Sequence, residues 1–312
     1  MRRTYIKKAE NQVCAEAARG TMKVRLISLT PVAYPNLALM KISAYDKSLG
    51  DTVSTDEPEP DKVYISSPFS QYKGACDYST MFPGAEIEYG GYGFSNVKLP
   101  ESIEHLMPDY TIFNCDRSYG FTTRGCIRNC SFCVVPKMEG KIWKNSPVQE
   151  FHHPDHNTVV LLDNNILYFD DWFMQNTDYI LKEDLKVDIE SGIDIRLVNE
   201  KNAERLRELK HAGCLHFAFD DISYEKELRR GIEILEKAGF KPRALMCYVL
   251  AWPGGFDDDA WHRMEIIWKE YGIDPFIEIY NNSMEDHSIR RLARWCNKPQ
   301  LRKSCEFSEY NK

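Results

Sequence analysis

The N-terminal third of the chain alternates short apolar runs with polar turns, as small α/β domains do. Three segments with strand-like patterns predict strands: residues 22–30, 62–66 and 86–89. The stretch from Leu37 to Leu49 predicts a helix that ends at Gly50. Residues 51–61 are acidic and contain prolines, which indicates a linker. Together these elements predict a small open α/β sheet of flavodoxin-like type.

From residue 119 onward the pattern changes to repeated strand–helix units. In residues 200–211, Ala203, Leu206 and Leu209 share one helical face, and residues 226–238 predict a second helix. Six segments predict strands: residues 119–124, 159–162, 187–191, 215–219, 243–250 and 275–280. A closed barrel of this kind needs about eight βα units, so we expect a partial (β/α)6 barrel of TIM type.

These patterns divide the chain into four parts. We expect a polar leader at 1–20, a small α/β domain at 21–115, a barrel core at 116–285 and a basic C-terminal helix at 286–312. The basic residues of the last part predict a solvated helix face, and contact with nucleic acid is the minority alternative.

Composition narrows the function classes only slightly. The 312 residues are 43% hydrophobic and 28% charged, as in ordinary globular proteins. A net charge of −7 gives no overall attraction to nucleic acid or to an anionic membrane. No apolar run approaches the ~20 residues of a membrane-spanning helix, and the basic N-terminus lacks the apolar stretch of a signal peptide. We therefore expect no membrane partner.

The cysteines carry the strongest chemical signal. Cys126, Cys130 and Cys133 form a C-x3-C-x2-C motif, while the other seven of the ten cysteines are scattered. Scattered thiols without a signal peptide fit the reducing cytoplasm better than a disulfide framework, so we expect a cytoplasmic location. Three thiolates on one loop can hold three irons of a four-iron cluster and leave the fourth iron open to a small molecule.

Structural zinc is the alternative interpretation of this motif. Zinc prefers four ligands, and the fourth is available from Cys115, His152, His153 or His156. However, zinc sites usually pair two short hooks, and the sequence has no second C-x2-C pair; its H-x3-H spacing is that of His152 and His156. Pro154 also argues against a shared helical face for His152 and His156. The pattern favours iron–sulfur ligation.

The motif and its neighbours resemble the cluster loop of the radical S-adenosylmethionine (radical SAM) superfamily. Phe132 stands just before the last cysteine, Thr122 to Gly125 precede the motif, and Val134 to Pro136 follow it. The resemblance implies a [4Fe-4S] cluster whose open iron binds S-adenosylmethionine. It also implies reductive cleavage to a 5′-deoxyadenosyl radical that acts on a substrate the sequence does not identify. An external one-electron donor of flavodoxin or ferredoxin type is implied as partner.

The first domain resembles, in shortened form, the cobalamin-binding-like domain that precedes some radical SAM barrels. The likeness rests on Gly90 to Glu101 and on the sequence Pro108-Asp109-Tyr110. The D-x-H-x-x-G motif whose histidine reaches cobalt is absent, and His105 is the only histidine of this region. Cobalamin is therefore not predicted.

Polar residues that follow the predicted strands are the other candidates for a site. In barrels of parallel strands the working residues lie at the carboxyl ends of strands. This rule selects Asp163, Asn164 and Asn165 after the second strand, and further residues after the later ones: Gly192, Asp194, Arg196, Asp220, Asp221, Trp252, Pro253, Gly254, Asn281 and Asn282. Asp and Asn at strand ends also serve simply as turn formers and helix caps.

The resemblance implies cofactor-binding roles for some of these residues. Asp163, Asn164 and Asn165 match the segment that holds the methionyl amino group. Asp194 lies on the loop after the third strand, and Asp220 or Asp221 matches the ribose-binding position. Arg196 or Arg243 is suited to pair with the carboxylate of S-adenosylmethionine. The turn at Trp252 resembles the one that packs against adenine. No catalytic residue is identified.

Two other function classes remain open. One is a non-catalytic iron–sulfur or zinc module, and the other is an RNA-modifying methylthiotransferase or methyltransferase. Measured cleavage of S-adenosylmethionine would exclude the non-catalytic module. Salt-dependent RNA binding that needs Arg290, Arg291 and Arg294 would favour the second.

Overall fold

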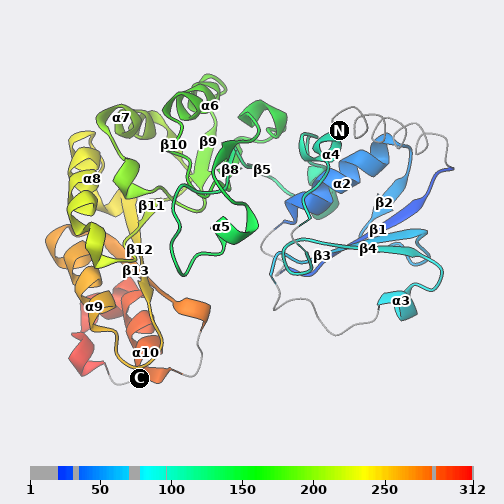
Figure 1. Cartoon of the computed structure of the whole chain (residues 1–312). Helices are drawn as coiled ribbons and strands as arrows, with labels where there is room; N and C mark the ends of the chain where they lie inside the picture. The colour runs from blue at the N-terminus through cyan, green and yellow to red at the C-terminus, as the bar shows by residue number, and fades with distance from the viewer. Residues whose placement is uncertain (1–19, 31–34, 70–77, 96, 283–285, 311–312) are drawn as a thin grey trace. The chain divides into compact units, whose positions relative to one another are not determined.

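The computed structural model describes residues 20–30, 35–69, 78–95, 97–282 and 286–310, which form two compact units. The first unit comprises Met1–Ser118 with Glu150–His153, and the second Tyr119–Gln149 with Pro154–Lys312. Both are mixed α/β structures with parallel sheets (Figure 1). The expected leader at 1–20 lies almost wholly outside the described residues.

The first unit contains a four-stranded parallel sheet in the order β2-β1-β3-β4. Its strands are β1 (Lys23–Ser28), β2 (Thr52–Ser54), β3 (Lys62–Ser66) and β4 (Glu86–Gly90). The region expected to be a linker, 51–61, contributes β2. The acidic and proline-rich composition hid a strand of three residues, in which only Val53 is buried.

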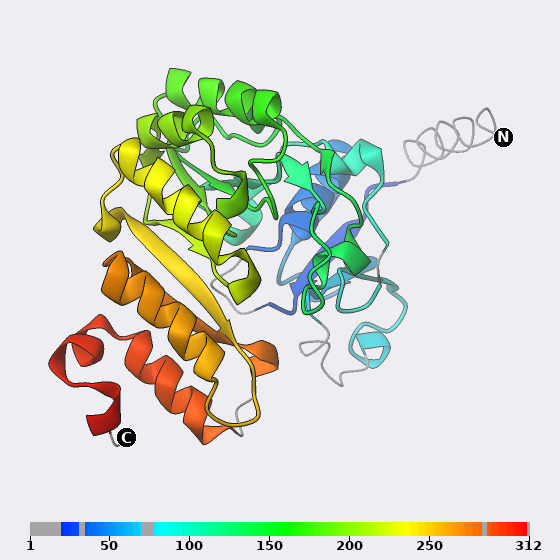
Figure 2. The same ribbon diagram turned by 60° about the vertical axis from the view of Figure 1, so that its left-hand side comes forward.

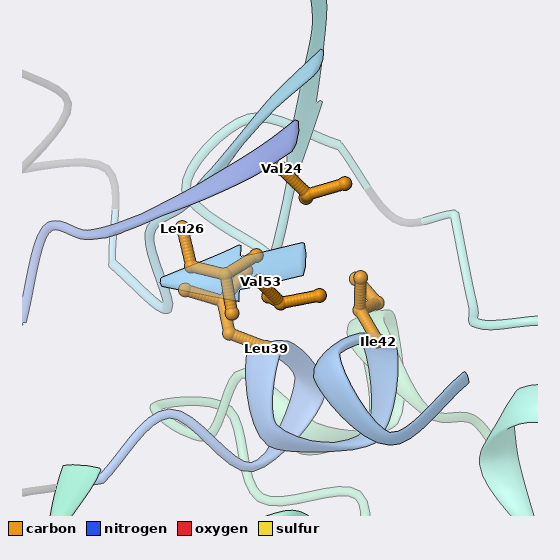
Figure 3. Close-up of a cluster of buried hydrophobic side chains, with 5 residues drawn as sticks. All are labelled: Val24, Leu26, Leu39, Ile42 and Val53. Carbon is orange, nitrogen blue, oxygen red and sulfur yellow. The ribbon is translucent and has the colours of Figure 1, made fainter. Parts of the chain in front are cut away.

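Helix α2 (Leu37–Ser48) covers one face of this sheet. Figure 3 shows Leu39 and Ile42 of α2 directed toward Val24, Leu26 and Val53 of the strands, and all five side chains are at most 8% exposed. The side chain of Asn36 caps the helix by accepting from Leu39 N at 3.2 Å, and Gly50 after its end has φ +93°. Short helices complete the unit: α3 (Tyr78–Met81), α4 (Glu101–Glu104) and η2 (Tyr110–Phe113).

The two larger sheets of the second unit have the strand orders β10-β9-β8-β5 and β11-β12-β13. The strands are β5 (Ser118–Gly120), β8 (Thr158–Leu161), β9 (Lys186–Ile189), β10 (Lys210–His211), β11 (Leu215–Ala218), β12 (Leu245–Ala251) and β13 (Asp274–Ile279). One isolated parallel bridge pairs Ile193, in the loop after β9, with Phe217 of β11. The described strands do not close into a barrel.

Helices follow most of these strands. They are α6 (Asp170–Lys182), α7 (Glu200–Glu208), α8 (Glu225–Lys237), α9 (Asp258–Glu265), α10 (His287–Cys296) and α11 (Pro299–Ser304). Helices α9 and α10 run beside β12 and β13 (Figure 2). The C-terminal segment, expected to be one helix, is divided because Pro299 cannot continue α10 and instead begins α11.

Two other predicted elements differ from the structure. The strand expected at 119–124 is divided into β5 and β6 (Thr123–Arg124), and β6 forms an antiparallel hairpin with β7 (Trp143–Lys144). The helix expected to reach residue 211 ends at Glu208, and the next residues form β10. There, pairing with β9 overrides the local helical pattern.

Candidate functional site

The three motif cysteines lie on the loop that follows β6. All three are free thiols of intermediate exposure, and Cys133 N donates to Cys130 O at 3.1 Å. Gly125 begins the loop with φ +75°, and a Cβ atom there would lie 2.5 Å from Lys141 O. Only glycine permits this close approach of the loop to the backbone at residues 140–141.

Glu139, just after the short helix α5 (Val135–Met138), holds the start of this loop. Its carboxylate pairs with Arg124 at 3.1 Å and accepts from Gly125 N at 2.7 Å. It also accepts from Asn164 Nδ2 at 2.8 Å, which links the loop to the end of β8. The sequence prediction missed Glu139, because no spacing rule marks a carboxylate six residues after the last cysteine.

Asp163 is fully buried at the end of β8 and is satisfied within the protein. Its carboxyl group accepts from Thr122 N at 3.0 Å, Thr122 Oγ1 at 2.6 Å and Thr123 Oγ1 at 2.7 Å, and also from Thr123 N. Burial raises the pKa of Asp163, although these hydrogen bonds oppose the rise. Asp163 therefore holds β6 against β8. Both of its carboxyl oxygens already accept hydrogen bonds, and the side chain is not exposed to a ligand.

Asn165 reaches the cysteine loop directly. Its Nδ2 lies 3.6 Å from Cys126 Sγ and 3.3 Å from Asp194 Oδ2. Its Oδ1 is buried and has no hydrogen-bond partner in the described part of the chain. A buried acceptor without a donor is costly, so this atom marks a place where a donor from a bound molecule fits.

Asp194, which follows β9, joins two arginines at the same place. It pairs with Arg128 Nε at 2.8 Å and with Arg196 Nε at 2.6 Å. Although burial acts to raise the pKa of Asp194, hydrogen bonds from Arg196 and Arg128 bring it below its ordinary value. The Arg196 guanidinium also lies 4.5 Å from the centre of the Tyr224 ring. Arg196 thus reaches the site with Asp194 as its counter-ion.

The thiols of the motif influence one another's ionisation. Burial raises the pKa of Cys130 and of Cys133; the charge of Arg196 lowers that of Cys130, while Cys126 raises both. Among the described residues, no three His, Cys, Asp or Glu side chains are arranged to hold a metal ion as they stand. Ligation by the three thiols therefore requires them to turn toward one another.

Asp220, after β11, has few partners for a buried carboxyl group. Its Oδ1 accepts from Leu250 N at 3.2 Å, and burial raises its pKa to about 6. Its charge also raises the pKa of Cys130 and of Cys133. Asp221, by contrast, is exposed and caps the turn η5 (Ile222–Tyr224) through Ser223 N at 2.8 Å.

Trp252, after β12, contacts the cysteine loop. Its ring centre lies 6.3 Å from that of Phe132 and 4.5 Å from that of Tyr280. Asp286 fixes the following turn by accepting from Gly254 N and Gly255 N, both at 2.8 Å. Trp252 remains 43% exposed, so part of its surface is accessible.

Arg243 is not brought to this site. It lies in η6 (Pro242–Ala244), before β12 begins, and is exposed. The strand predicted at residues 243–250 included Arg243, whereas the observed strand starts at Leu245. Arg243 is therefore at the amino end of β12, opposite the end that carries Trp252.

The basic C-terminal residues are partly structural. Arg291 donates to Phe307 O at 2.8 Å and to Tyr310 O, and its guanidinium lies over the Phe307 ring. Arg302 is 2% exposed and pairs with Asp274. These two arginines are occupied in holding the C-terminal segment.

No protein-family model matches this chain. In the part of the chain that the structure describes, no helix is long and apolar enough to cross a membrane. The function must therefore be argued from the residues of the site.

Proposed function

We propose that this protein is a radical SAM enzyme that holds a [4Fe-4S] cluster on Cys126, Cys130 and Cys133. The observation that carries the proposal is the C-x3-C-x2-C loop beside Asn165, whose side chain contacts Cys126 and keeps a buried, unpartnered oxygen. Three thiols suit three irons, and the open iron suits an amino acid that chelates through nitrogen and oxygen. When bound, the cluster supplies the electron that cleaves S-adenosylmethionine to methionine and a 5′-deoxyadenosyl radical.

The chain's own residues have positioning roles in this proposal. Glu139 and Gly125 fix the start of the loop, and Asp163 holds the strand from which it leaves. Asn165 Oδ1 accepts from the methionyl amino group. Arg128 and Arg196, which both pair with Asp194, would bind the carboxylate of the same molecule.

The remaining candidates surround the rest of the cofactor. Asp220 is suited to ribose hydroxyls, because a carboxyl group with one amide donor has acceptor capacity left. The accessible surface of Trp252 is suited to adenine. Asn164 is occupied by Glu139, and Asp221 by its own turn, so we assign neither a direct contact. We also withdraw Arg243 from the cofactor site.

The strand arrangement supports the finer fold assignment. The order β2-β1-β3-β4 is that of a flavodoxin-like sheet without a fifth strand. The parallel strands of the second unit and the bridge from Ile193 to Phe217 suit an open partial barrel. We propose a cytoplasmic enzyme that takes its electron from a flavodoxin or ferredoxin and acts on a substrate other than nucleic acid.

Anaerobic reconstitution tests the proposal. Wild type is compared with a variant in which Cys126, Cys130 and Cys133 are alanine, and with a control in which Cys115, Cys214 and Cys305 are alanine. Iron and sulfide are counted, and 5′-deoxyadenosine is measured after dithionite and S-adenosylmethionine are added. We expect about four irons and cleavage in wild type and control only. A metal content dominated by zinc, or a cluster that never cleaves S-adenosylmethionine, would leave a binding module instead.

A further inference from the structure

The sheet β11-β12-β13 has one packed face and one open face. Successive strand residues point to opposite faces. Phe217, Cys247, Val249 and Ile277 are buried on the packed face, where Cys296 of α10 reaches Pro275 O at 3.6 Å. The alternate residues His216, Tyr248 and Phe276 are only partly buried, so they mark the open face.

These three residues form a row of rings across the strands. The ring centres of His216 and Tyr248 are 5.5 Å apart at 73°, and those of Tyr248 and Phe276 are 5.6 Å apart at 76°. Edge-to-face neighbours of this kind hold one another in place and leave ring surface available for a flat apolar group. The row is therefore a fixed aromatic platform.

His216 adds an unsatisfied polar atom to the platform. Its Nδ1 is buried and has no hydrogen-bond partner among the residues described. Burial lowers the pKa of His216, and the charge of Asp188 on β9 opposes this effect. A neutral imidazole has one donor and one acceptor nitrogen, so it can pair with a hydroxyl or an N–H group of a ligand.

The charged groups on this face favour a cation. On the open face of β11, β12 and β13 the ionisable residues are His216, Tyr248, Asp274 and Glu278, and Asp274 is already paired with Arg302. The Glu278 side chain is exposed overall, yet burial of its carboxyl group raises its pKa. Its charge also raises the pKa of Asp220. Carboxylate beside aromatic rings is the complement of an ammonium group.

We propose that this face binds a small substrate that carries a protonated amine beside a flat apolar or aromatic portion. The ammonium group pairs with Glu278, the flat portion packs on Tyr248 and Phe276, and a hydroxyl or N–H group meets His216 Nδ1. This inference rests on the proposed function, because it names the substrate class for the same unit. Asp220 is electrostatically coupled to both sites, since its charge raises the pKa of Cys130 and the charge of Glu278 raises its own pKa.

Binding of tyramine to the full-length protein, measured by titration calorimetry, tests this site. Tyramine joins a ring, a hydroxyl and an ammonium group, while 4-ethylphenol is its neutral analogue and 4-hydroxyphenylacetate its anionic one. We expect tyramine to bind at least about tenfold more tightly than 4-ethylphenol, the loss expected for a charge-assisted hydrogen bond. The anionic analogue should not bind.

Variants assign the contacts. Glu278→Gln should weaken tyramine binding about tenfold and His216→Phe severalfold, whereas Glu236→Gln, an exposed glutamate of α8, should leave it unchanged. Glu278→Gln keeps the side-chain shape, so an unaltered melting temperature separates lost binding from lost folding. Equal binding of the three ligands, or tyramine binding indifferent to Glu278→Gln and His216→Phe, would overturn the assignment.

The two proposals fail separately. The variant without Cys126, Cys130 and Cys133 should bind tyramine as wild type does, since none of the cysteines belongs to the platform. If reconstitution gives no cleavage while tyramine binding still depends on Glu278, the radical SAM function falls and the amine site stands. If cleavage occurs but tyramine binding does not depend on charge, the amine site falls alone.

Discussion

Two aspartates at strand ends of the second unit have opposite surroundings. Asp163, after β8, accepts four hydrogen bonds from Thr122 and Thr123, whereas Asp220, after β11, accepts one from Leu250 N. Both carboxyl groups are buried enough for their pKa values to rise. The comparison teaches that position at a strand end does not decide a residue's role. The role depends on how many hydrogen bonds the carboxyl group already accepts within the protein.

The satisfied aspartate should produce the largest loss on substitution. Asp163→Ala leaves the donors of Thr122 and Thr123 buried without an acceptor, and we expect about 3–5 kcal/mol of unfolding free energy to be lost. Urea unfolding measures this loss. Asp171→Ala, whose side chain is 99% exposed, is the matched control and should change stability by less than about 0.5 kcal/mol. Equal effects of the two substitutions would refute the contrast.

The under-satisfied aspartate should behave in the opposite way. The pKa of Asp220 is raised from 3.8 to about 6, so the folded state binds the proton more tightly than the unfolded state. Stability therefore falls as the pH rises from about 4 to about 6, and the cost persists above that window. Asp220→Asn keeps an acceptor for Leu250 N and removes the charge.

We expect Asp220→Asn to be more stable than wild type by up to about 3 kcal/mol at pH 8 and to be equal to it at pH 4. Urea titrations at pH 4, 5, 6, 7 and 8 provide the measurement. A stability difference that does not change with pH would mean that Asp220 titrates normally in the folded protein. The same substitution should leave iron content unchanged.

Glu278 offers a finer test of the same contrast. Because its charge contributes to the raised pKa of Asp220, Glu278→Gln should lower that pKa by a fraction of a unit. Carboxyl carbon NMR follows Asp220 directly. The pKa of Asp109, in the other unit, is set by burial, Lys47 and Ser43, and it serves as the internal reference that should not move.

The sequence predicted the elements whose residues and ends carry a local signal. The range of α2 and the strands β3 and β13 lie within a residue or so of expectation, because apolar positions and Gly50 mark them locally. Sequence reasoning failed where a strand is defined by the strand it pairs with. Strands β2, β6 and β10 have two or three residues each and form only because they pair with their neighbours. The helices α6 and α9 were also not predicted.

For the candidate site, sequence reasoning found the residue types but not their partners. Cys126, Asn165 and Asp194 are brought together, as the strand-end positions of the last two suggest. The sequence did not show that Glu139 occupies Asn164, that Asp163 is saturated by two threonines, or that Arg243 precedes its strand. The first two facts depend on side chains that meet across 25 to 41 residues of sequence, which no local pattern records, and the third is a strand boundary displaced by two residues.

Asp286 should give the smallest effect, confined to the turn after Trp252. Its carboxylate accepts from Gly254 N, Gly255 N and Ile289 N, and these bonds lower its pKa to about 2. A lowered pKa means that the stabilising contribution is present above about pH 4 and is lost as the pH falls toward 2. Asp286→Ala should speed hydrogen exchange of the Gly254 and Gly255 amides severalfold at pH 7 while the exchange of β12 amides stays slow. Exchange that accelerates throughout β12 would show instead that Asp286, like Asp163, supports the sheet and not only the turn.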